Sequence, residues 1–229
     1  MEEMTKMERR AVARQRSDVY GLLATVYRQE VSKDFLREMK DPQLLGVLSE
    51  LGMAWAEEIS QKPEEELLDD LAVEYARLFL GPGKHISPHE SVWEQRKGGQ
   101  RGQLWGESTV EVKRLVESVG LHCAPEYSGL PDHLSVELEF MQQMTLREEQ
   151  AWQEGDKETA LHCLRIERKF LEEHLSCWIP VFCEEVMTEA ELPFYSDMAA
   201  LTRNYIEFEM DQITTMKTVS VGGIGDQER

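Results

Sequence analysis

The sequence predicts an all-α protein, a single helical-bundle domain of about nine to ten helices. Hydrophobic residues recur with the 3.6-residue helical period along most of the 229-residue chain. Helix-start residues alternate with Gly and Pro stops, and neither a credible hairpin nor a repeat of fixed length interrupts them. Hydrophobic residues make up 41% and charged residues 30%, a balance that excludes global disorder and leaves ample material for a core.

The first helices are marked by an apolar stripe and by two start signals. Asp41 followed by Pro42 is typical of an N-cap with proline at the first helical position. Pro63, followed by three glutamates at 64–66, indicates another start, since acidic groups favour the positive end of the helix dipole. Gly81-Pro-Gly83 ends that helix. The earliest stripe has the spacing i, i+3, i+4, i+7 and consists of Tyr20, Leu23, Ala24 and Tyr27.

The middle of the chain has less periodicity. Residues 84–107 show little of it, and the basic, Gly-rich stretch 96–102 is expected to be a mobile loop. Ser108 with Glu111 fits a capping box at the start of the next helix. A second break at 120–131 is predicted to be a hinge between two helical halves, which would permit a domain-swapped dimer beside the monomer.

The last third is again helical. Asp132 is predicted to cap a helix that runs through Glu149. Further helices are expected after the turn at Gly155-Asp156, from about Ile179, and from Ser196 to Met216. We therefore expect one helical domain over residues 1–218 and a disordered tail over residues 219–229.

The charge of the chain is strongly negative. The 44 Asp and Glu outnumber the 25 Lys and Arg, which gives a formal net charge of −19. This balance argues against binding of nucleic acid or anionic lipid, whose phosphates require a basic face. It favours a cationic partner, because negative potential accelerates encounters with positive peptides, although solubility alone would explain the charge equally well.

Cysteine usage and the N-terminus indicate the cytoplasm. Four cysteines without a CxxC pair are too few for a disulfide scaffold, so reduced thiols are expected. The first ten residues contain both acidic and basic side chains and lack the apolar core that a signal peptide needs. No run reaches the length of about 18 apolar residues that a membrane span needs.

The first segment with candidate binding residues is 74–93. Tyr75, Leu78 and Phe79 lie on the last turns of a helix, after which the chain turns sharply at Gly81-Pro82. A loop returning beside that helix end would add aromatic and acidic groups. Such a surface suits a peptide, because apolar pockets anchor its side chains and Glu90 can pair with arginine. The alternative is that the helix residues are core and the loop residues only fix the loop. The loop residues are Pro88, His89, Glu90, Ser91 and Trp93.

The second segment is 130–141. Asp132 is placed at the cap, His133 in the exposed first turn, and Glu137 four residues later on the same face. Carboxylates that flank an imidazole could accept a guanidinium or a backbone amide. The alternative is that Asp132 is only a cap and His133 a surface residue.

Together the two segments resemble the TorD/DmsD/NarJ family of redox-enzyme maturation chaperones. Leu192-Pro-Phe-Tyr195 also resembles the C-terminal part of that family, whereas His89 departs from it, since an aromatic residue is usual after the proline. The matching residues of the first segment are Tyr75, Leu78, Phe79, Gly81, Pro82, Pro88, Glu90 and Ser91. Those of the second are Asp132, His133, Leu134, Glu137, Phe140 and Met141.

The resemblance implies a TorD/DmsD-like fold and a cytoplasmic chaperone without catalytic turnover. The sequence itself offers no motif for a cofactor, so none is expected. It implies that the chain binds the leader peptide and apoprotein of a molybdopterin-containing oxidoreductase subunit, with a twin-arginine leader, until cofactor has been inserted. Polar contacts are expected from Glu90, Asp132, His133 and Glu137. The apolar groove is expected to be lined by Tyr75, Leu78, Phe79, Pro88 and Trp93. The alternative within the family is a NarJ-like chaperone for a subunit that is not exported.

The rival from another class is a metal-dependent enzyme built on His85, His89 and Glu90. Zinc sites favour fixed spacings such as CxxC or HExxH, and neither occurs here. The chain also lacks the GxSxG, Walker A and Rossmann fingerprints. No metal site is therefore expected.

Overall fold

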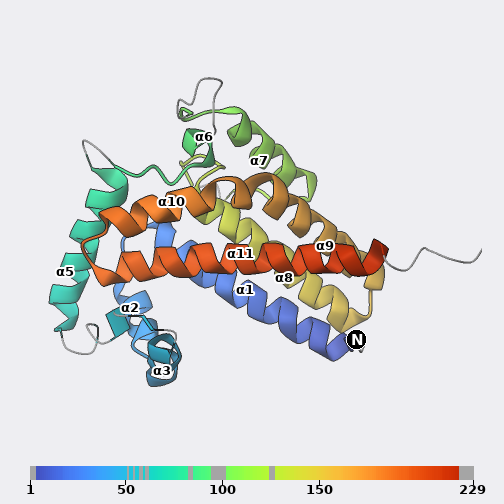
Figure 1. Cartoon of the computed structure of the whole chain (residues 1–229), viewed down its shortest axis with the longest axis horizontal. Helices are drawn as coiled ribbons and strands as arrows, with labels where there is room; N and C mark the ends of the chain where they lie inside the picture. The colour runs from blue at the N-terminus through green and yellow to red at the C-terminus, as the bar shows by residue number, and fades with distance from the viewer. Residues whose placement is uncertain are drawn as a thin grey trace, which may run out of the picture.

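The computed structural model describes residues 4–50, 52–53, 55–56, 59, 62–81, 85–93, 102–123 and 127–221, the last nine of them by their backbone alone. Figure 1 shows the arrangement of the helices. The part of the chain that the structure describes contains no β-strand, in agreement with the predicted all-α class.

The long helices form the bundle. Helix α1 (Lys6–Arg28) packs along α8 (Leu134–Glu154), which in turn packs on α9 (Lys157–Phe170). After the π-helical turn η2 (Leu171–Leu175), helix α10 (Ser176–Glu189) runs beside α11 (Pro193–Val221). Thr5 starts α1 with a capping box, since its hydroxyl accepts from the Glu8 amide and the Glu8 carboxylate accepts from the Thr5 amide.

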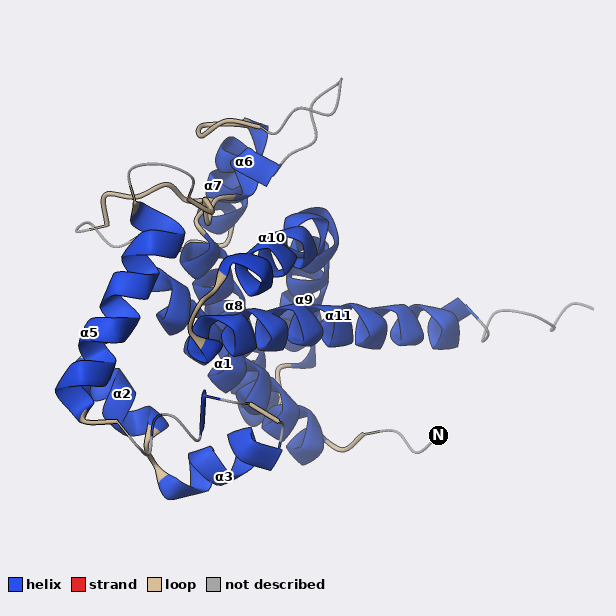
Figure 2. Cartoon of the chain, turned by 60° about the vertical axis from the view of Figure 1, so that its left-hand side comes forward, coloured by secondary structure: helices blue, strands red, loops and turns tan. Residues whose placement is uncertain are grey.

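Shorter helices cover one end of this bundle. They are α2 (Lys33–Met39), α3 (Pro42–Glu50) and α5 (Glu64–Tyr75), which continues as the π-helical turn η1 (Ala76–Leu80). A second short pair, α6 (Glu90–Trp93) and α7 (Glu107–Ser118), lies apart from these, as Figures 1 and 2 both show. The two predicted starts at 42 and 64 and the stop at Gly81 are confirmed.

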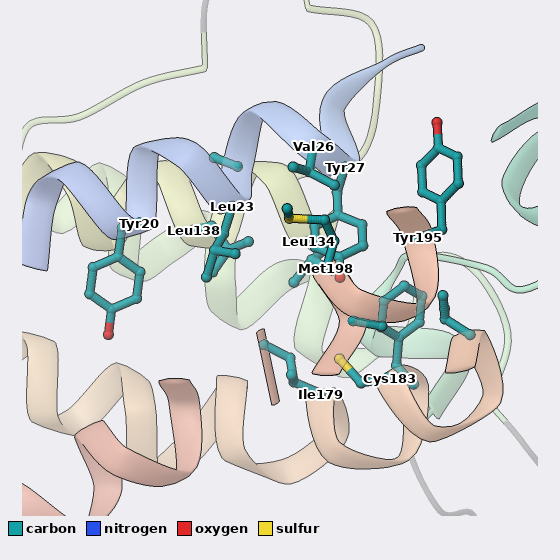
Figure 3. Packing of buried hydrophobic residues seen from close by; sticks show 14 of the residues in the cluster. Tyr20, Leu23, Val26, Tyr27, Leu134, Leu138, Ile179, Cys183, Tyr195 and Met198 are labelled. Atoms are coloured by element: carbon teal, nitrogen blue, oxygen red, sulfur yellow. The ribbon is translucent and has the colours of Figure 1, made fainter. Parts of the chain in front are cut away.

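The core lies where four helices meet. Figure 3 shows Tyr20, Leu23 and Tyr27 of α1 directed toward residues of α8, α10 and α11. All of these side chains are excluded from water, and each contributes about 1.5–3 kcal/mol of hydrophobic free energy. The partners that Figure 3 labels are Leu134, Leu138, Ile179, Cys183, Tyr195 and Met198.

One predicted cap and one predicted turn are confirmed by hydrogen bonds. The Asp41 carboxylate accepts from the amides of Gln43 and Leu44, at 2.9 and 3.2 Å. Gly155 adopts a left-handed φ of 82°, and the next residue, Asp156, caps α9 through the Thr159 amide at 3.0 Å. Both features were predictable from the sequence because each hydrogen bond joins residues that are at most three positions apart.

Two other predicted caps were wrong. Helix α7 begins one residue before Ser108 with Gly106 as N-cap, and Ser108 is buried inside the helix, so no capping box forms there. Helix α8 is capped by His133 instead of Asp132, because the His133 ring accepts from the Ser135 amide. This helix also runs to Glu154, beyond the expected Glu149.

The C-terminal helices are longer than predicted. Helix α10 starts at Ser176, three residues ahead of the expected Ile179, because η2 joins α9 and α10 without a break, and Pro180 is accommodated inside α10 just after that π-helical turn. Helix α11 starts at Pro193, ahead of the expected Ser196, and continues into the expected tail to Val221. Residues 222–229 of the tail, 96–101 of the basic stretch and 124–126 of the predicted hinge lie outside the described residues. None of the described helices is long and apolar enough to span a membrane.

Candidate functional site

The two segments singled out in the sequence meet in the structure. His89 and His133 form an isolated antiparallel bridge. The Glu90 amide donates to the Asp132 carbonyl at 3.0 Å, and the Leu134 amide donates to the Pro88 carbonyl at 2.8 Å. We call residues 85–93 and 130–137 the junction. Because the backbone itself is paired, the junction fixes the two segments in register.

Asp132 caps a different helix from the one predicted. Its carboxylate is fully buried and accepts from the Ser91 amide, in the first turn of α6, at 3.0 Å. An acidic group at this position satisfies an amide that has no partner within the helix. Asp132 thus belongs to the second segment but holds the start of a helix in the first.

The two histidine rings lie at the outer side of this pairing. They are 4.9 Å apart between centroids and nearly perpendicular, at 85°. Burial lowers the pKa of His89, and burial together with the His89 ring lowers the pKa of His133 to about 4. Both imidazoles are therefore neutral near pH 7, which agrees with the role of His133 Nδ1 as an acceptor for the Ser135 amide.

The glutamate of the first segment points inward. The Glu90 carboxylate lies 3.0 and 3.2 Å from Nδ1 of His174, which comes from η2, and both side chains are buried. π-Helical turns are frequent at functional sites. Here one such turn, η2, supplies the partner of Glu90, and the other, η1, carries Leu78 and Phe79.

Glu137 also points inward instead of lying beside His133. The Trp178 indole donates to its carboxylate at 3.1 Å, and the side chain is fully buried. Burial and the neighbouring Glu90 raise the pKa of Glu137 well above its usual value. A protonated Glu137 can donate to Glu90, so the two neighbouring buried carboxyl groups need not both carry negative charge.

The apolar residues of the first segment are core. Tyr75, Leu78 and Phe79 are 3%, 2% and 4% exposed. The Tyr75 hydroxyl donates to the Tyr27 carbonyl at 3.0 Å, and the Phe79 ring packs against those of Tyr75 and Tyr195. The likeness at 192–195 therefore has a structural basis, because Tyr195 closes the same aromatic cluster.

The surface of the junction is formed by fewer residues than the sequence suggested. His89, Trp93 and His133 are half-buried, whereas Pro88 and Ser91 are buried. The Trp93 indole donates to the Ser87 carbonyl at 2.8 Å, and its ring lies 5.8 Å from that of Phe182. The structure thus separates three residues that a ligand can touch from a larger set that holds them in place.

Sequence reasoning missed His174 and Trp178, which hold the two glutamates. Both lie in a run of helical residues, and nothing local distinguishes a histidine that faces the core from one on the surface. The helical spacing of Leu171, Leu175 and Trp178 indicates a buried indole but does not identify Glu137 as its partner. The partners of Glu90 and Glu137 come from 84 and 41 residues away.

Sequence reasoning also missed a second buried set of charges, which we call the Arg16 cluster. One guanidinium contacts Glu148, Glu167 and Glu209 at 3.0, 2.8 and 2.8 Å. The Tyr20 hydroxyl donates to Glu209, and the Trp152 indole donates to Glu148. Burial raises the pKa of Glu167 to about 7, against the opposing effect of Arg16. These residues come from α1, α8, α9 and α11 and join the four long helices.

The rival metal site does not fit this geometry. Glu90 is bound to His174, so its carboxylate is not available to His85 and His89 as a third ligand. Within the described ranges no group of three or more His, Cys, Asp or Glu is placed to hold a metal ion. The metal-dependent alternative built on His85, His89 and Glu90 is therefore not supported.

Comparison with known proteins yields a family and several relatives. A family described as nitrate reductase delta subunit matches residues 46–184. A chaperone protein TorD from Photobacterium profundum is 26% identical over 193 residues, which are 80% of this chain and 86% of that protein. A TorD from Vibrio parahaemolyticus is 26% identical over 209 residues, 85% of this chain and 92% of the relative. A solved redox enzyme maturation protein from Archaeoglobus fulgidus aligns with a TM-score of 0.48 at 21% identity, over 83% of this chain and 93% of that one.

Proposed function

Since the chain belongs to the nitrate reductase delta subunit family, we propose that it is a TorD-like chaperone for a molybdopterin-containing oxidoreductase subunit. It binds the leader peptide and the apoprotein of this client, and so keeps the apoprotein open until cofactor has been inserted. Such a role requires binding without any bond being made or broken, in keeping with the expectation that the chain is not an enzyme. We place this binding in the cytoplasm, before export of the client.

The observation that carries the proposal is the pairing of the two segments. Residues from two distant parts of the chain are brought together by backbone hydrogen bonds at 2.8 and 3.0 Å, which place the His89 and His133 rings 4.9 Å apart. The half-buried Trp93 lies four residues beyond His89 in the first segment. Neutral imidazoles and an indole form an amphipathic surface with low loss of side-chain entropy on binding. This is the chemistry that an apolar, cationic peptide requires.

The division of roles follows from burial. We assign contacts with the leader to the half-buried His89, Trp93 and His133, and place the buried Pro88 and Ser91 among the residues that hold them in position. The remaining residues are buried and hold the two segments in position; they are Tyr75, Leu78, Phe79, Glu90, Asp132 and Glu137. The net charge of −19 attracts the basic leader at long range.

Calorimetric titration tests the proposal. The purified chain is titrated with synthetic leader peptides of the molybdoenzymes encoded beside its gene. One leader is expected to bind, and the double variant His89→Ala with Trp93→Ala is expected to weaken it by about tenfold or more. Val181→Ala, at a 54% exposed position of α10, is the matched control. Absence of binding by every leader would overturn the proposal.

A second candidate is a chaperone for a subunit that is not exported, which the name of the matched family favours. Co-purification from the native host separates the two. A captured subunit with a twin-arginine leader supports the first candidate, and a captured subunit without one supports the second.

The assembly state remains a proposal of its own. The segment 120–131 joins α7 to α8, and Gly120 adopts a left-handed φ of 72° at the point where α7 ends. A change of direction at this glycine would let halves exchange between two chains. Size-exclusion chromatography with light scattering should show monomer with a minor dimer, and monomer alone across refolding conditions would remove the idea.

A further inference from the structure

A surface cleft of about 110 Å³ lies next to the junction, between α7, α8 and the described residues 121–123 and 127 between them. Its walls include Val116 of α7, Tyr127, and Val136 and Phe140 of α8. We call it the α7–α8 cleft. Its volume is below the usual size of a small-molecule site, so it suits one or two side chains of a longer ligand.

The rim of the cleft carries one ion pair. Arg28, at the end of α1, pairs with Glu139 of α8, and both residues line the cleft. The two side chains are 49% and 31% exposed. Ion pairs with this exposure contribute little to stability, so the partner of Glu139 can be exchanged at small cost.

Glu139 is the group that an incoming cation would use. Burial raises the pKa of its carboxyl, and Arg28 opposes this rise. The Arg28 guanidinium, which pairs with this carboxylate, thus favours the ionised form of Glu139. A guanidinium from a ligand would favour that form as well as Arg28 does, because its fork geometry matches a carboxylate in two bonds.

The cleft adjoins the junction. Val136 lines the cleft and belongs to the junction, and Phe140 lies one turn further along α8, the helix that His133 caps. The Tyr127 hydroxyl donates to the carbonyl of Leu130, where the second segment begins, at 3.0 Å. A peptide that touches the junction would therefore reach the cleft without leaving the surface of α8.

We propose that the α7–α8 cleft is the docking site for an arginine and an adjacent apolar side chain of the client leader. The leader guanidinium replaces Arg28 on Glu139, and the apolar side chain enters between Val136 and Phe140. Arg28 in the free protein thus occupies the place that the ligand takes. This inference rests on the proposed function and assigns the basic part of the leader to a place outside the residues that the sequence nominated.

The negative charge of the molecule indicates which kind of ligand binds in the α7–α8 cleft. Anionic ligands such as phosphates would meet Glu139 and a net charge of −19, with Arg28 as the only cation among the described lining residues. A second copy of this chain would bring a further −19. A cationic, partly apolar peptide meets favourable chemistry on both the rim and the walls.

A cysteine that the chain already has allows the cleft to be blocked. Cys123 lines the cleft and is exposed, whereas Cys163 and Cys183 are buried. In a Cys177→Ser background, Cys123 is coupled to a bulky maleimide. The matched control carries Cys177→Ser, Cys123→Ser and Gln150→Cys, which places the label at an exposed position of α8, two turns beyond the cleft.

The probe is the synthetic leader peptide that binds the unmodified chain in the titration described above. Labelling of Cys123 is expected to weaken its binding by about tenfold or more, and labelling of the Gln150→Cys control to leave it unchanged. If both labelled proteins bound the leader equally well, the cleft would not be the docking site, and the proposed function would remain intact. If no leader binds the unmodified chain, the proposed function and this inference both fail.

Arg28→Ala provides an independent test, because this variant is expected to bind the leader more tightly and not more weakly. Removal of the internal competitor should tighten leader binding about three- to tenfold, whereas loss of a contact residue would weaken it. Arg14→Ala, at a 57% exposed position of the same helix, removes the same charge without touching the cleft. An equal effect of the two variants would mean that long-range charge alone is responsible, and would overturn the proposed exchange.

A leader in which the arginines are replaced by lysines completes the test. Lysine cannot form the two parallel bonds of a guanidinium with Glu139, so this peptide should bind more weakly to the unmodified chain. Glu139→Gln should abolish that difference. A preference for arginine that persists in Glu139→Gln would overturn the assignment of Glu139.

Discussion

Two clusters of buried carboxyl groups in the described part of the chain are stabilised differently. In the Arg16 cluster, one guanidinium contacts three glutamates at 2.8–3.0 Å. At the junction, Glu90, Asp132 and Glu137 receive hydrogen bonds from an imidazole, a backbone amide and an indole. The first arrangement is held by charge and joins four long helices. The second is held by hydrogen bonds of fixed direction, which makes it better suited to setting the register of two loops.

Removal of the only cation of the Arg16 cluster should have the largest effect. Arg16→Met keeps much of the side-chain volume but leaves Glu148, Glu167 and Glu209 buried without their partner. We expect a loss of about 3–5 kcal/mol in the free energy of unfolding, measured by chemical denaturation. Arg14→Met, which breaks exposed pairs with Asp18 and Glu149, should cost about 0–1 kcal/mol.

A small effect of Arg16→Met would break the comparison. It would mean that the glutamates take up protons when the guanidinium is removed, so that hydrogen bonds suffice in the bundle as they do at the junction. The pH dependence of the variant would then become much steeper than that of the unmodified chain.

Asp132 gives the next largest effect, because its hydrogen bond spans the junction. Asp132→Ala removes the acceptor for the Ser91 amide in a fully buried place, so we expect a loss of about 1–3 kcal/mol. Asp156→Ala, which removes an exposed cap within its own turn, should cost about 1 kcal/mol. Leader binding should fall only in the Asp132 variant. Equal losses of binding would contradict a special role for the junction.

The capping aspartates also show which contacts could be predicted from the sequence. Asp41 was identified as a cap and Gly155-Asp156 as a turn because their signals act within three residues. Asp132 was assigned to the wrong helix, because its partner lies 41 residues away and only the fold brings the two together. The helical class was predictable from periodicity, which is a property of each segment alone.

The residues of the candidate site could be identified from the sequence, but the directions in which their side chains point could not. Glu137 was placed beside His133 by helical spacing, yet it points toward Trp178 on the far helix. Arg16 gave no signal, since an arginine with glutamates elsewhere in the sequence is usually a solvated side chain. Residues near in space and distant in sequence could not be paired from one sequence, and the α7–α8 cleft belongs to the same class.

The two regions should respond to acid in opposite directions. The pKa of Glu167 is raised to about 7, so its folded form holds a proton that the unfolded chain releases near pH 4.5, and stability falls as pH rises from 4.5 to 7. The pKa of His133 is lowered to about 4, so stability is lost as pH falls from 6.5 to 4. Each contribution is about 1–2 kcal/mol after allowance for solvent and coupling.

Single variants separate these two contributions in denaturation curves taken between pH 4 and 7. Glu167→Gln should remove the decline of stability with rising pH, and His133→Asn, which keeps an N-cap, should remove the loss in acid. If Glu167→Gln left the pH profile unchanged, Glu167 would be ionised throughout. The Arg16 cluster would then be neutralised by charge alone.

The smallest effect should come from Glu137→Gln. A protonated Glu137 accepts from the Trp178 indole and donates toward Glu90, and a glutamine amide can do both with the same shape. We expect a change below about 1 kcal/mol near pH 7, against about 2–4 kcal/mol for Glu137→Ala, which also leaves a cavity. A loss above about 2 kcal/mol for the glutamine variant would show that the carboxyl is ionised when folded. The junction would then hold buried negative charge on hydrogen bonds alone, and the contrast with the Arg16 cluster would be sharper than a shared proton makes it.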